Sequence, residues 1–340
     1  MNRSSELTYT PAWWVPGAHL QTLWGKLVRR LHAVTTRSER WTTPDDDEVE
    51  MHRLGAPPGA GSDTPRLLLL HGLEGTIRSH YLQGTLALAQ ARGWAADVLV
   101  FRGCNGEVNR VRRMYHSGET TDLDFVVRRL IRENPDQPLL IAGFSLGGNV
   151  LLKWLGEQGA DAPEQLRAAA AVSVPFDLER GARNIERGFA RVYTWHFMRT
   201  LRLKALAKLD RFPDLFDPAA LRRARTLFEF DDCVTAPVHG FASAHDYYSR
   251  SSSLPYLSSI QVPTLLLSSS DDPFLPPQVF DEVAVVARMN TFLLPELWPH
   301  GGHVGFVSGA SPLDTHYYHE QRVIEFLGLQ ADRVSAVPTP

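Results

Sequence analysis

Short apolar segments alternate with longer segments of helical character over residues 66–174. Four of the apolar segments are predicted as strands: 66–70, 95–100, 139–142 and 167–174. The pattern predicts three helices between them: 79–92, 120–133 and 148–158. Parallel strands need a crossover of about a dozen residues, which a helix supplies. The alternation therefore predicts the α/β class, with a mostly parallel central sheet and helices on both of its faces.

The alternation stops near residue 175 and resumes with a predicted strand over 262–268. A helix over 277–289, a strand over 291–297 and a helix over 313–329 follow it. Helical spacing in the interruption predicts one or two helices, which is typical of a cap inserted above a binding site. The expected division is an N-terminal extension, an α/β core in two parts, a helical cap and a flexible tail: 1–58, 59–174 with 257–330, 175–256 and 331–340.

The N-terminal extension combines an amphipathic helix with a strand pair. Six apolar residues follow helical spacing: Leu20, Leu23, Trp24, Leu27, Val28 and Leu31. The favoured interpretation is a helix packed on the core, and the alternative is a helix that enters a bilayer surface. Segments 34–42 and 49–54 are predicted as the first strands, joined by a turn around 44–47.

Charge and composition exclude several classes of protein. The formal net charge of the 340 residues is −3, which carries no nucleic-acid signature. Residues 180–225 contain twelve Arg or Lys and four Asp or Glu, so this block is basic. Its basic face suits anionic substrates or lipid surfaces, and a solvated helix face explains it equally well. The sequence does not determine the oligomeric state.

The location expected from the sequence is the cytoplasm, with peripheral contact to a membrane as an option. The two cysteines, Cys104 and Cys233, suit a reducing compartment. No apolar run approaches the ~18 residues of a membrane span. The polar segment 1–10 lacks the apolar stretch of a secretory signal.

Residues 143–149, Gly-Phe-Ser-Leu-Gly-Gly-Asn, contain the pattern Gly-x-Ser-x-Gly. A predicted strand precedes it and a predicted helix follows it. Such a turn strains the backbone of Ser145 and lifts its hydroxyl above the edge of the sheet. Side chains in place of Gly143 and Gly147 would collide with the neighbouring strand and helix. The pattern predicts Ser145 as a nucleophile, and the alternative is a turn of small residues that only packs.

A serine hydroxyl needs a base to take its proton, and a carboxylate that orients the base. Asp272 follows the predicted strand 262–268, and His303 follows the strand 291–297. Side chains at the carboxyl ends of parallel strands converge, so these two residues are expected beside Ser145. The chain order Ser, Asp, His is one of the known orders of catalytic triads.

Neighbouring residues compete for both roles. Asp272 is preferred to Asp271 because Pro276 follows it by four residues, and Asp271 is then expected to shape the turn. His303 is preferred to five other histidines: His71, His116, His300, His316 and His319. We expect His71 to order its loop, His116 to be structural, and the last two to lie at the surface of a C-terminal helix.

An oxyanion hole needs two backbone N–H groups that point at the developing negative charge. The first is predicted at Leu146, directly after the serine. The second is predicted at Leu73, in the loop His71-Gly72-Leu73-Glu74-Gly75 after the strand 66–70. Gly72 and Gly75 allow this loop to turn towards the pocket, and an ordinary tight turn would also explain them.

Other chemistries lack their motifs. The sequence contains no His-Glu-x-x-His zinc motif and no Gly-x-x-x-x-Gly-Lys-[Ser/Thr] phosphate loop. Segment 103–106 carries no dinucleotide fingerprint, and Cys104 has no evident base partner, so a structural role is expected for it. We predict neither a metal nor a cofactor.

Taken together, these motifs resemble those of the YheT-like esterases of the α/β-hydrolase superfamily. The segments that carry the resemblance are 17–22, 71–75, 101–106, 115–118, 143–149, 271–274 and 301–306. The resemblance implies the α/β-hydrolase fold, acyl-ester substrates, and a Ser–Asp–His triad at Ser145, Asp272 and His303. Chain length and head group of the substrate do not follow from it.

The sequence thus predicts a serine carboxylic-ester hydrolase that uses an acyl-serine intermediate. Short- to medium-chain acyl esters or acylglycerol-type lipids are the expected substrates. One alternative is an alcohol O-acyltransferase, in which an alcohol intercepts the same acyl-enzyme. The other is a ligand-binding protein on a hydrolase scaffold that performs no catalysis.

Overall fold

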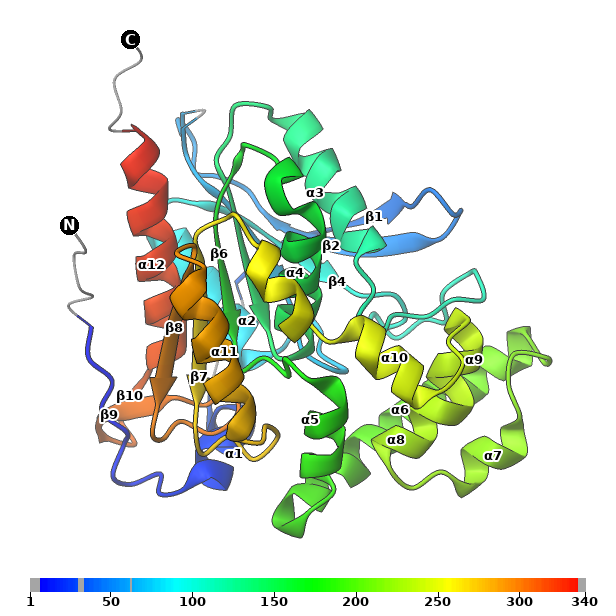
Figure 1. Ribbon diagram of the computed structural model, residues 1–340. Helices are drawn as coiled ribbons and strands as arrows, with labels where there is room; N and C mark the ends of the chain where they lie inside the picture. Colours follow the sequence, from blue (N-terminus) through cyan, green and yellow to red (C-terminus); the bar gives the residue numbers. More distant parts are fainter. Residues whose placement is uncertain (1–6, 30–33, 62, 336–340) are drawn as a thin grey trace.

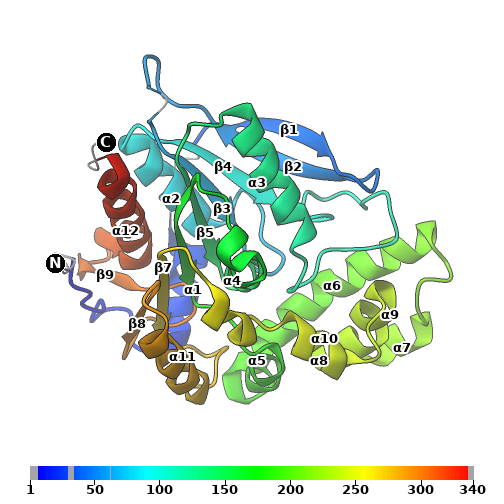
Figure 2. The same cartoon turned by 45° about the horizontal axis from the view of Figure 1, so that its top comes forward.

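The computed structural model describes residues 7–29, 34–61 and 63–335. A mixed sheet lies between two layers of helices, and a group of further helices lies to one side (Figures 1 and 2). Helices α2 and α12 pack together on one face of the sheet, and α3, α4 and α11 lie on the other. This arrangement confirms the predicted α/β-hydrolase fold with helices on both faces.

Eight strands form the sheet in the order β1-β2-β4-β3-β5-β6-β7-β8. Strand β2 pairs antiparallel with β1 on one side and with β4 on the other. All remaining pairs, from β4 across to β8, are parallel. The strands are β1 Arg37–Thr42, β2 Glu48–Leu54, β3 Arg66–Leu70, β4 Ala95–Val100, β5 Leu139–Phe144, β6 Leu166–Val172, β7 Thr264–Ser269 and β8 Leu293–Trp298. Strands β4, β5 and β7 are buried along their whole length, as the central strands of a parallel sheet with both faces covered are, and apolar residues predominate in β4 and β5.

The helices of the N-terminal extension and core are α1 Ala18–Val28, α2 His80–Ala91, α3 Thr121–Glu133, α4 Leu146–Gln158, α11 Gln278–Met289 and α12 Tyr318–Ser335. Each crossover between parallel strands carries at least one helix, as the alternation in the sequence predicts. Of the predicted N-terminal stripe, Leu31 lies outside the described residues.

The interruption after β6 forms a helical cap. Its helices are α5 Leu178–Ile185, α6 Arg191–Arg211, α7 Pro218–Arg223, α8 Leu227–Phe230, α9 Ala236–His239 and α10 Ala244–Ser251. Short segments complete the chain between the helices: η1 Gly159–Asp161 in the core, then η2 Gly188–Ala190, η3 Asp231–Thr235 and η4 Leu254–Ser259. The cap has a small hydrophobic core of its own, which includes Met198, Leu201, Phe216 and Phe230.

The prediction at the C-terminal end was partly wrong. Residues predicted to begin a helix at 313 form instead an antiparallel hairpin, β9 Val307–Ser311 and β10 Asp314–Tyr317. Contacts distant in sequence stabilise it, because Trp13 and Trp14 donate their indole N–H groups to the carbonyls of Ala310 and Gly309 at 3.1 Å each. The helix begins only at Tyr318 and continues to Ser335, beyond the predicted end; residues 336–340 lie outside the described part.

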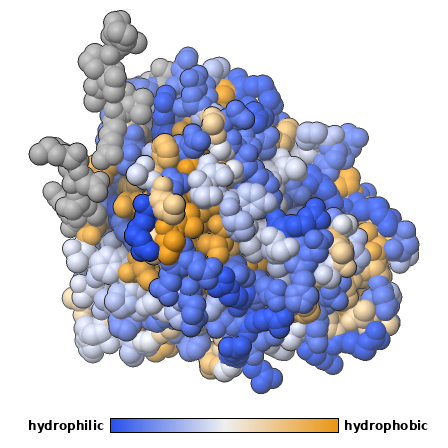
Figure 3. Space-filling model, viewed as in Figure 1, coloured by the Kyte–Doolittle hydropathy of each residue, from blue (hydrophilic) through white to orange (hydrophobic). Residues whose placement is uncertain are grey.

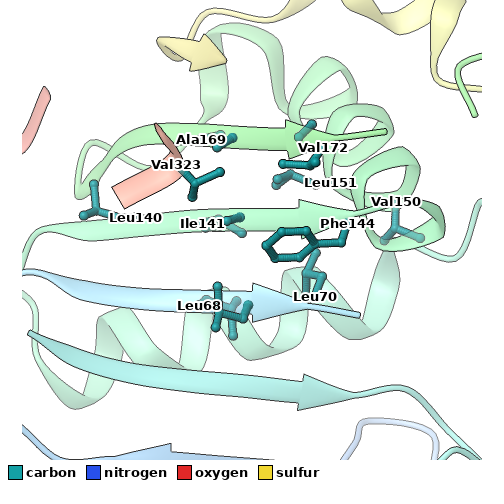
Figure 4. Close-up of a cluster of buried hydrophobic side chains, with 14 of the residues drawn as sticks. Leu68, Leu70, Leu140, Ile141, Phe144, Val150, Leu151, Ala169, Val172 and Val323 are labelled. Carbon is teal, nitrogen blue, oxygen red and sulfur yellow. The ribbon is translucent and has the colours of Figure 1, made fainter. Parts of the chain in front are cut away.

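The centre of the molecule is a hydrophobic layer between the sheet and its helices. Figure 4 shows Leu68, Ile141, Phe144 and Val172 on β3, β5 and β6 beside Leu151 of α4, with Val323 of α12 close to the same strands. All of these side chains are fully buried. Burial of one such side chain contributes ~1.5–3 kcal/mol, so this layer fixes the positions of the strand ends.

A buried arginine fastens the N-terminal extension to the core. The guanidinium of Arg102, just after β4, is fully buried. It donates hydrogen bonds to Asp47 at 2.8 Å and Asp45 at 2.9 Å in the β1–β2 turn, and to Asp122 of α3 at 2.6 Å. Asp45 and Asp47 of this turn therefore belong to a partly buried ion-pair network.

Substitution Arg102→Met is expected to lower the free energy of unfolding by about 3–5 kcal/mol, because it leaves buried carboxylates without their partner. Urea unfolding followed by circular dichroism measures this change. Arg128→Met is the matched control, since Arg128 pairs with Asp124 at 2.7 Å on the exposed face of α3. That control should cost less than about 1 kcal/mol, and equal losses in both variants would contradict the role of the buried network.

Candidate active site

Ser145 occupies a strained turn between β5 and α4. Its backbone has φ 52° and ψ −120°, a region that residues other than glycine rarely adopt. A Cβ atom on Gly143 would lie 2.5 Å from the Gly147 carbonyl oxygen, and one on Gly147 would lie 2.5 Å from the His71 carbonyl oxygen. Both glycines are therefore required by close backbone packing, in agreement with the steric argument from the sequence.

The imidazole of His303 lies between the serine and an aspartate. Its Nε2 is 2.8 Å from the Ser145 Oγ, and its Nδ1 is 2.8 Å from Asp272 Oδ2. The ring stacks on Phe274 with centroids 4.0 Å apart, and the His303 N–H donates to the Thr22 hydroxyl at 2.9 Å. These contacts hold the ring with Nδ1 towards the Asp272 carboxylate and Nε2 towards the Ser145 hydroxyl.

Of the two adjacent aspartates, only Asp272 contacts His303. Its side chain is fully buried, and its second oxygen accepts the Phe274 N–H at 2.8 Å. Asp271 accepts the Gly302 N–H at 2.9 Å and lies 3.3 Å from Nδ1 of His300. Asp271 therefore shapes the turn before His303, as expected for the aspartate that does not contact the histidine.

The other histidines lie in structural positions or at the surface. His71 is buried, donates from Nδ1 to the Gly72 carbonyl at 2.7 Å and accepts the Phe101 N–H at Nε2 at 3.1 Å. His316 is exposed on β10, not on a helix. The prediction of a surface position for His319 was wrong. The first turn of α12 faces the core, and His319 is fully buried there.

The loop after β3 passes directly beside Ser145. A Cβ atom on Gly72 would lie 3.2 Å from the serine Cβ, so Leu73 follows at the edge of the same space. Leu146 is the first residue of α4, where a helix leaves its amide N–H groups without partners inside the helix. In the described part of the chain, no hydrogen bond is donated by the N–H of Leu73 or Leu146. Neither N–H group therefore has a protein acceptor in this part of the chain.

A partly buried ion pair, not predicted from the sequence, links this loop to the cap. Glu74 has a left-handed backbone, φ 56°, directly after Leu73. Its carboxylate accepts the Tyr115 hydroxyl at 2.6 Å and the ammonium of Lys204, from α6, at 2.8 Å. These bonds hold the conformation of the loop. In the sequence, the signal for this ion pair is the glutamate within the segment 71–75. Its partner lies 130 residues away.

A cavity of about 140 Å³ opens beside Ser145 and His303, between the core and the cap. Most of its lining is apolar and includes Leu73, Leu146, Phe197, Leu201, Phe230 and Phe274. Burial, and next the neighbouring His239, lower the pKa of His116 to about 3. Burial likewise lowers the pKa of His239 to about 4. Both imidazoles are uncharged at neutral pH, which keeps this wall of the cavity without a net positive charge.

The structure also bears on a metal site, on the reactivity of Cys104 and on membrane-spanning helices. Among the residues that the structure describes, no cluster of three or more His, Cys, Asp or Glu has the arrangement of a metal site. Burial raises the pKa of Cys104 to about 11, so its thiol stays protonated and unreactive. The same described residues include no helix with the length and apolar character of a membrane span.

Known proteins share the sequence features and the fold of this chain. A family model described as the alpha/beta hydrolase fold matches residues 65–310. The chain is 39% identical to "Putative esterase YheT" of Escherichia coli (strain K12) over 326 residues, which cover 95% of this chain and 94% of that protein. It is 30% identical to "Phospholipase ABHD3" of Mus musculus over 316 residues, covering 91% and 76%.

A solved structure shares the fold at low sequence identity. The esterase Pf2001 of Pyrococcus furiosus superposes with a TM-score of 0.56 at 16% identity, covering 87% of this chain and 93% of that one. The family match and the long, well-covered alignment to the E. coli protein both extend over the elements that carry Ser145, Asp272 and His303. The chain belongs to the α/β-hydrolase fold family and, within it, to the YheT-like family that its motifs resemble.

Proposed function

We propose that this hydrolase cleaves carboxylic esters through an acyl-serine intermediate. The observation that carries the proposal is the pair of 2.8 Å contacts that join Ser145 to His303 and His303 to Asp272. Imidazole in contact with a hydroxyl removes its proton during attack, and the carboxylate stabilises the imidazolium that forms. The names of the relatives, an esterase and a phospholipase, support the same class of reaction.

In the first half-reaction, Ser145 Oγ bonds to the ester carbonyl carbon while its proton moves to His303 Nε2. The N–H groups of Leu73 and Leu146 bind the resulting oxyanion. The intermediate collapses, the bond to the alkoxy group breaks, and His303 returns the proton to the departing alcohol. Water then attacks the acyl-serine with His303 again as base, which releases the carboxylic acid and restores Ser145.

The cavity supports short- to medium-chain acyl esters or acylglycerol-type lipids as substrates. Its lining beside Ser145 is mainly apolar, and His116 and His239 are uncharged there. A volume of about 140 Å³ is below the ~300 Å³ at which pockets for drug-sized ligands begin. An acyl chain of moderate length fits this space better than a bulky polar group.

The proposal also covers the cofactor, the partner, the location and the domains of the enzyme. The chemistry requires no cofactor, and its partner is a small ester or lipid molecule. A cytoplasmic location, with peripheral contact to a membrane, suits a chain whose two cysteines are both free. The division into extension, core, cap and tail is retained as the proposed domain organisation.

Substitution Ser145→Ala is expected to lower kcat for p-nitrophenyl butyrate ~10⁴–10⁶-fold, because no other group replaces the nucleophile. The variant should retain the wild-type circular dichroism spectrum. A fluorophosphonate probe should label the wild type at Ser145 and leave the variant unlabelled. Unchanged esterase turnover in a clean preparation of the variant would overturn the mechanism.

The two aspartates provide a sharper comparison. Asp272→Asn is expected to lower kcat ~10⁴-fold, because an amide no longer fixes the tautomer of His303 or balances its charge. Asp271→Asn keeps the size of its side chain and leaves the contact between His303 and Asp272 in place, so its loss should be far smaller. Steady-state kinetics of both variants decide the assignment, and a larger loss in Asp271→Asn would reverse it.

A series of p-nitrophenyl esters tests the substrate class. We expect kcat/KM to rise from acetate to medium-chain esters as the apolar cavity fills, and to fall for long chains that exceed it. Activity confined to acetate would contradict the proposed acyl-chain site. Counting free acid against new ester in the presence of an added alcohol distinguishes hydrolysis from acyl transfer.

A further inference from the structure

Helix α6 of the cap is apolar on two opposite faces. Its inner face buries Met198 and Leu201 in the core of the cap. Its outer face leaves Trp195, Leu203 and Leu206 exposed to 64%, 61% and 40%. A surface helix of a globular protein normally carries polar residues on the side away from its core. The outer face of α6 therefore has the composition of a contact surface.

Helix α1 extends this apolar surface. The Lys26 ammonium lies 3.0 Å from Nε2 of His196 on α6, and the rings of His19 and Phe189 lie 4.6 Å apart. Leu27 beside this contact is 72% exposed. We call the joint surface the α1–α6 surface; it consists of Leu20, Leu27, Phe189, Val192, Trp195, Leu203 and Leu206, all of which are exposed.

Exposed hydrophobic side chains are concentrated here and are not spread evenly. Nine of the fifteen large hydrophobic side chains that are exposed within the described residues lie in 13–28 or 189–206. Figure 3, viewed as in Figure 1, shows a mainly hydrophilic face; the hydrophobic residues gathered left of its centre lie in the region of α11 and do not belong to the α1–α6 surface. Single exposed apolar residues are ordinary, whereas a contiguous group marks an interaction site.

Unpaired arginines surround the apolar side chains. A groove on the outer side of α6 is lined by Trp195 together with Arg191, Arg199, Arg202 and Arg225. In the part of the chain that the structure describes, these four arginines form no ion pair with a carboxylate, and Nε of Arg202 is buried without a hydrogen-bond partner. The groove therefore presents guanidinium donors that suit a phosphate group.

The charge selects between two occupants of this surface. A second copy bound through the same surface would bring the arginines of one chain against those of the other. Glu186 is the carboxylate that lines the groove, against four arginines, so positive charge is in excess there. A bilayer with anionic phospholipids matches both the apolar side chains and the arginines of this surface. The apolar side chains enter the acyl boundary, and the arginines bind the lipid phosphates.

We infer that the α1–α6 surface docks this protein on membranes that contain anionic phospholipids. The opposite face of α6 contributes Phe197, Leu201 and Lys204 to the cavity beside Ser145. A docked enzyme would thus have one wall of its cavity formed by the helix that lies on the bilayer. The idea that lipid esters reach Ser145 from the bilayer rests on the proposed function. The docking itself does not depend on that function.

Vesicle binding tests the inference without any measurement of turnover. We expect the full-length protein to float with vesicles of phosphatidylcholine containing about one third phosphatidylglycerol, and not with phosphatidylcholine alone. Added salt should weaken the binding. The double variant Arg199→Glu/Arg202→Glu and the variant Trp195→Ser should each bind at least about tenfold more weakly.

Matched controls lie at the C-terminal end of α11, outside the α1–α6 surface, where Arg288 and Met289 are exposed. Arg288→Glu and Met289→Ser should bind vesicles like the wild type. All variants should hydrolyse a short soluble ester at the wild-type rate, so loss of activity tests the proposed function separately. Failure of the wild type to bind, equal binding by all variants, or a wild-type dimer that Trp195→Ser converts to a monomer would each overturn the inference.

Discussion

The close approach of the backbone around Ser145 is the constraint on which the site depends. Strand β3 pairs with β5 so that Leu70 lies opposite Gly143, and the chain after β3 then passes over the turn that follows β5. A Cβ atom on Gly147 would meet the His71 carbonyl oxygen at 2.5 Å. Because no larger residue fits, the turn must be strained, and the strain holds the Ser145 hydroxyl at the carboxyl edge of the sheet.

The parallel sheet makes this edge a meeting point. Strands β3, β5, β7 and β8 all end there, and the loops after them carry Leu73, Ser145, Asp272 and His303. Hydrophobic packing of α4 and α12 against the sheet fixes the strand ends. This rigid scaffold therefore sets the positions of the loops. The cap then closes one side of the site and supplies the apolar wall of the cavity.

The cap also links catalysis to the surface of the molecule. On its inner side, Lys204 of α6 pairs with Glu74 in the loop that carries Leu73. On its outer side, the same helix exposes Trp195 and Arg199. One helix thus contacts the candidate oxyanion loop, lines the cavity and forms the proposed lipid surface. The ion pair between Lys204 and Glu74, and the packing of Leu73 against the core of the cap, would transmit a movement of α6 to the loop.

Much of the fold could be predicted because local patterns and global topology agree. The apolar runs that became β3 to β8 were long enough to be recognised, and so were the helices between them. The hairpin β9–β10 was missed because its stabilising partners, Trp13 and Trp14, lie almost 300 residues away. His319 was misplaced for the related reason that the start of α12, and with it the buried first turn, depends on that hairpin.

The sequence by itself determined the order of the strands and helices, the strained serine turn, and the short set of residues able to act with Ser145. These features depend on local side-chain size and on the spacing of apolar residues, which neighbouring positions reveal. Only the tertiary structure brought Asp272, and not Asp271, within 2.8 Å of His303, joined Glu74 to Lys204, and left the outer face of α6 exposed. Those outcomes depend on distances between segments remote in the chain, and packing of the whole molecule sets such distances.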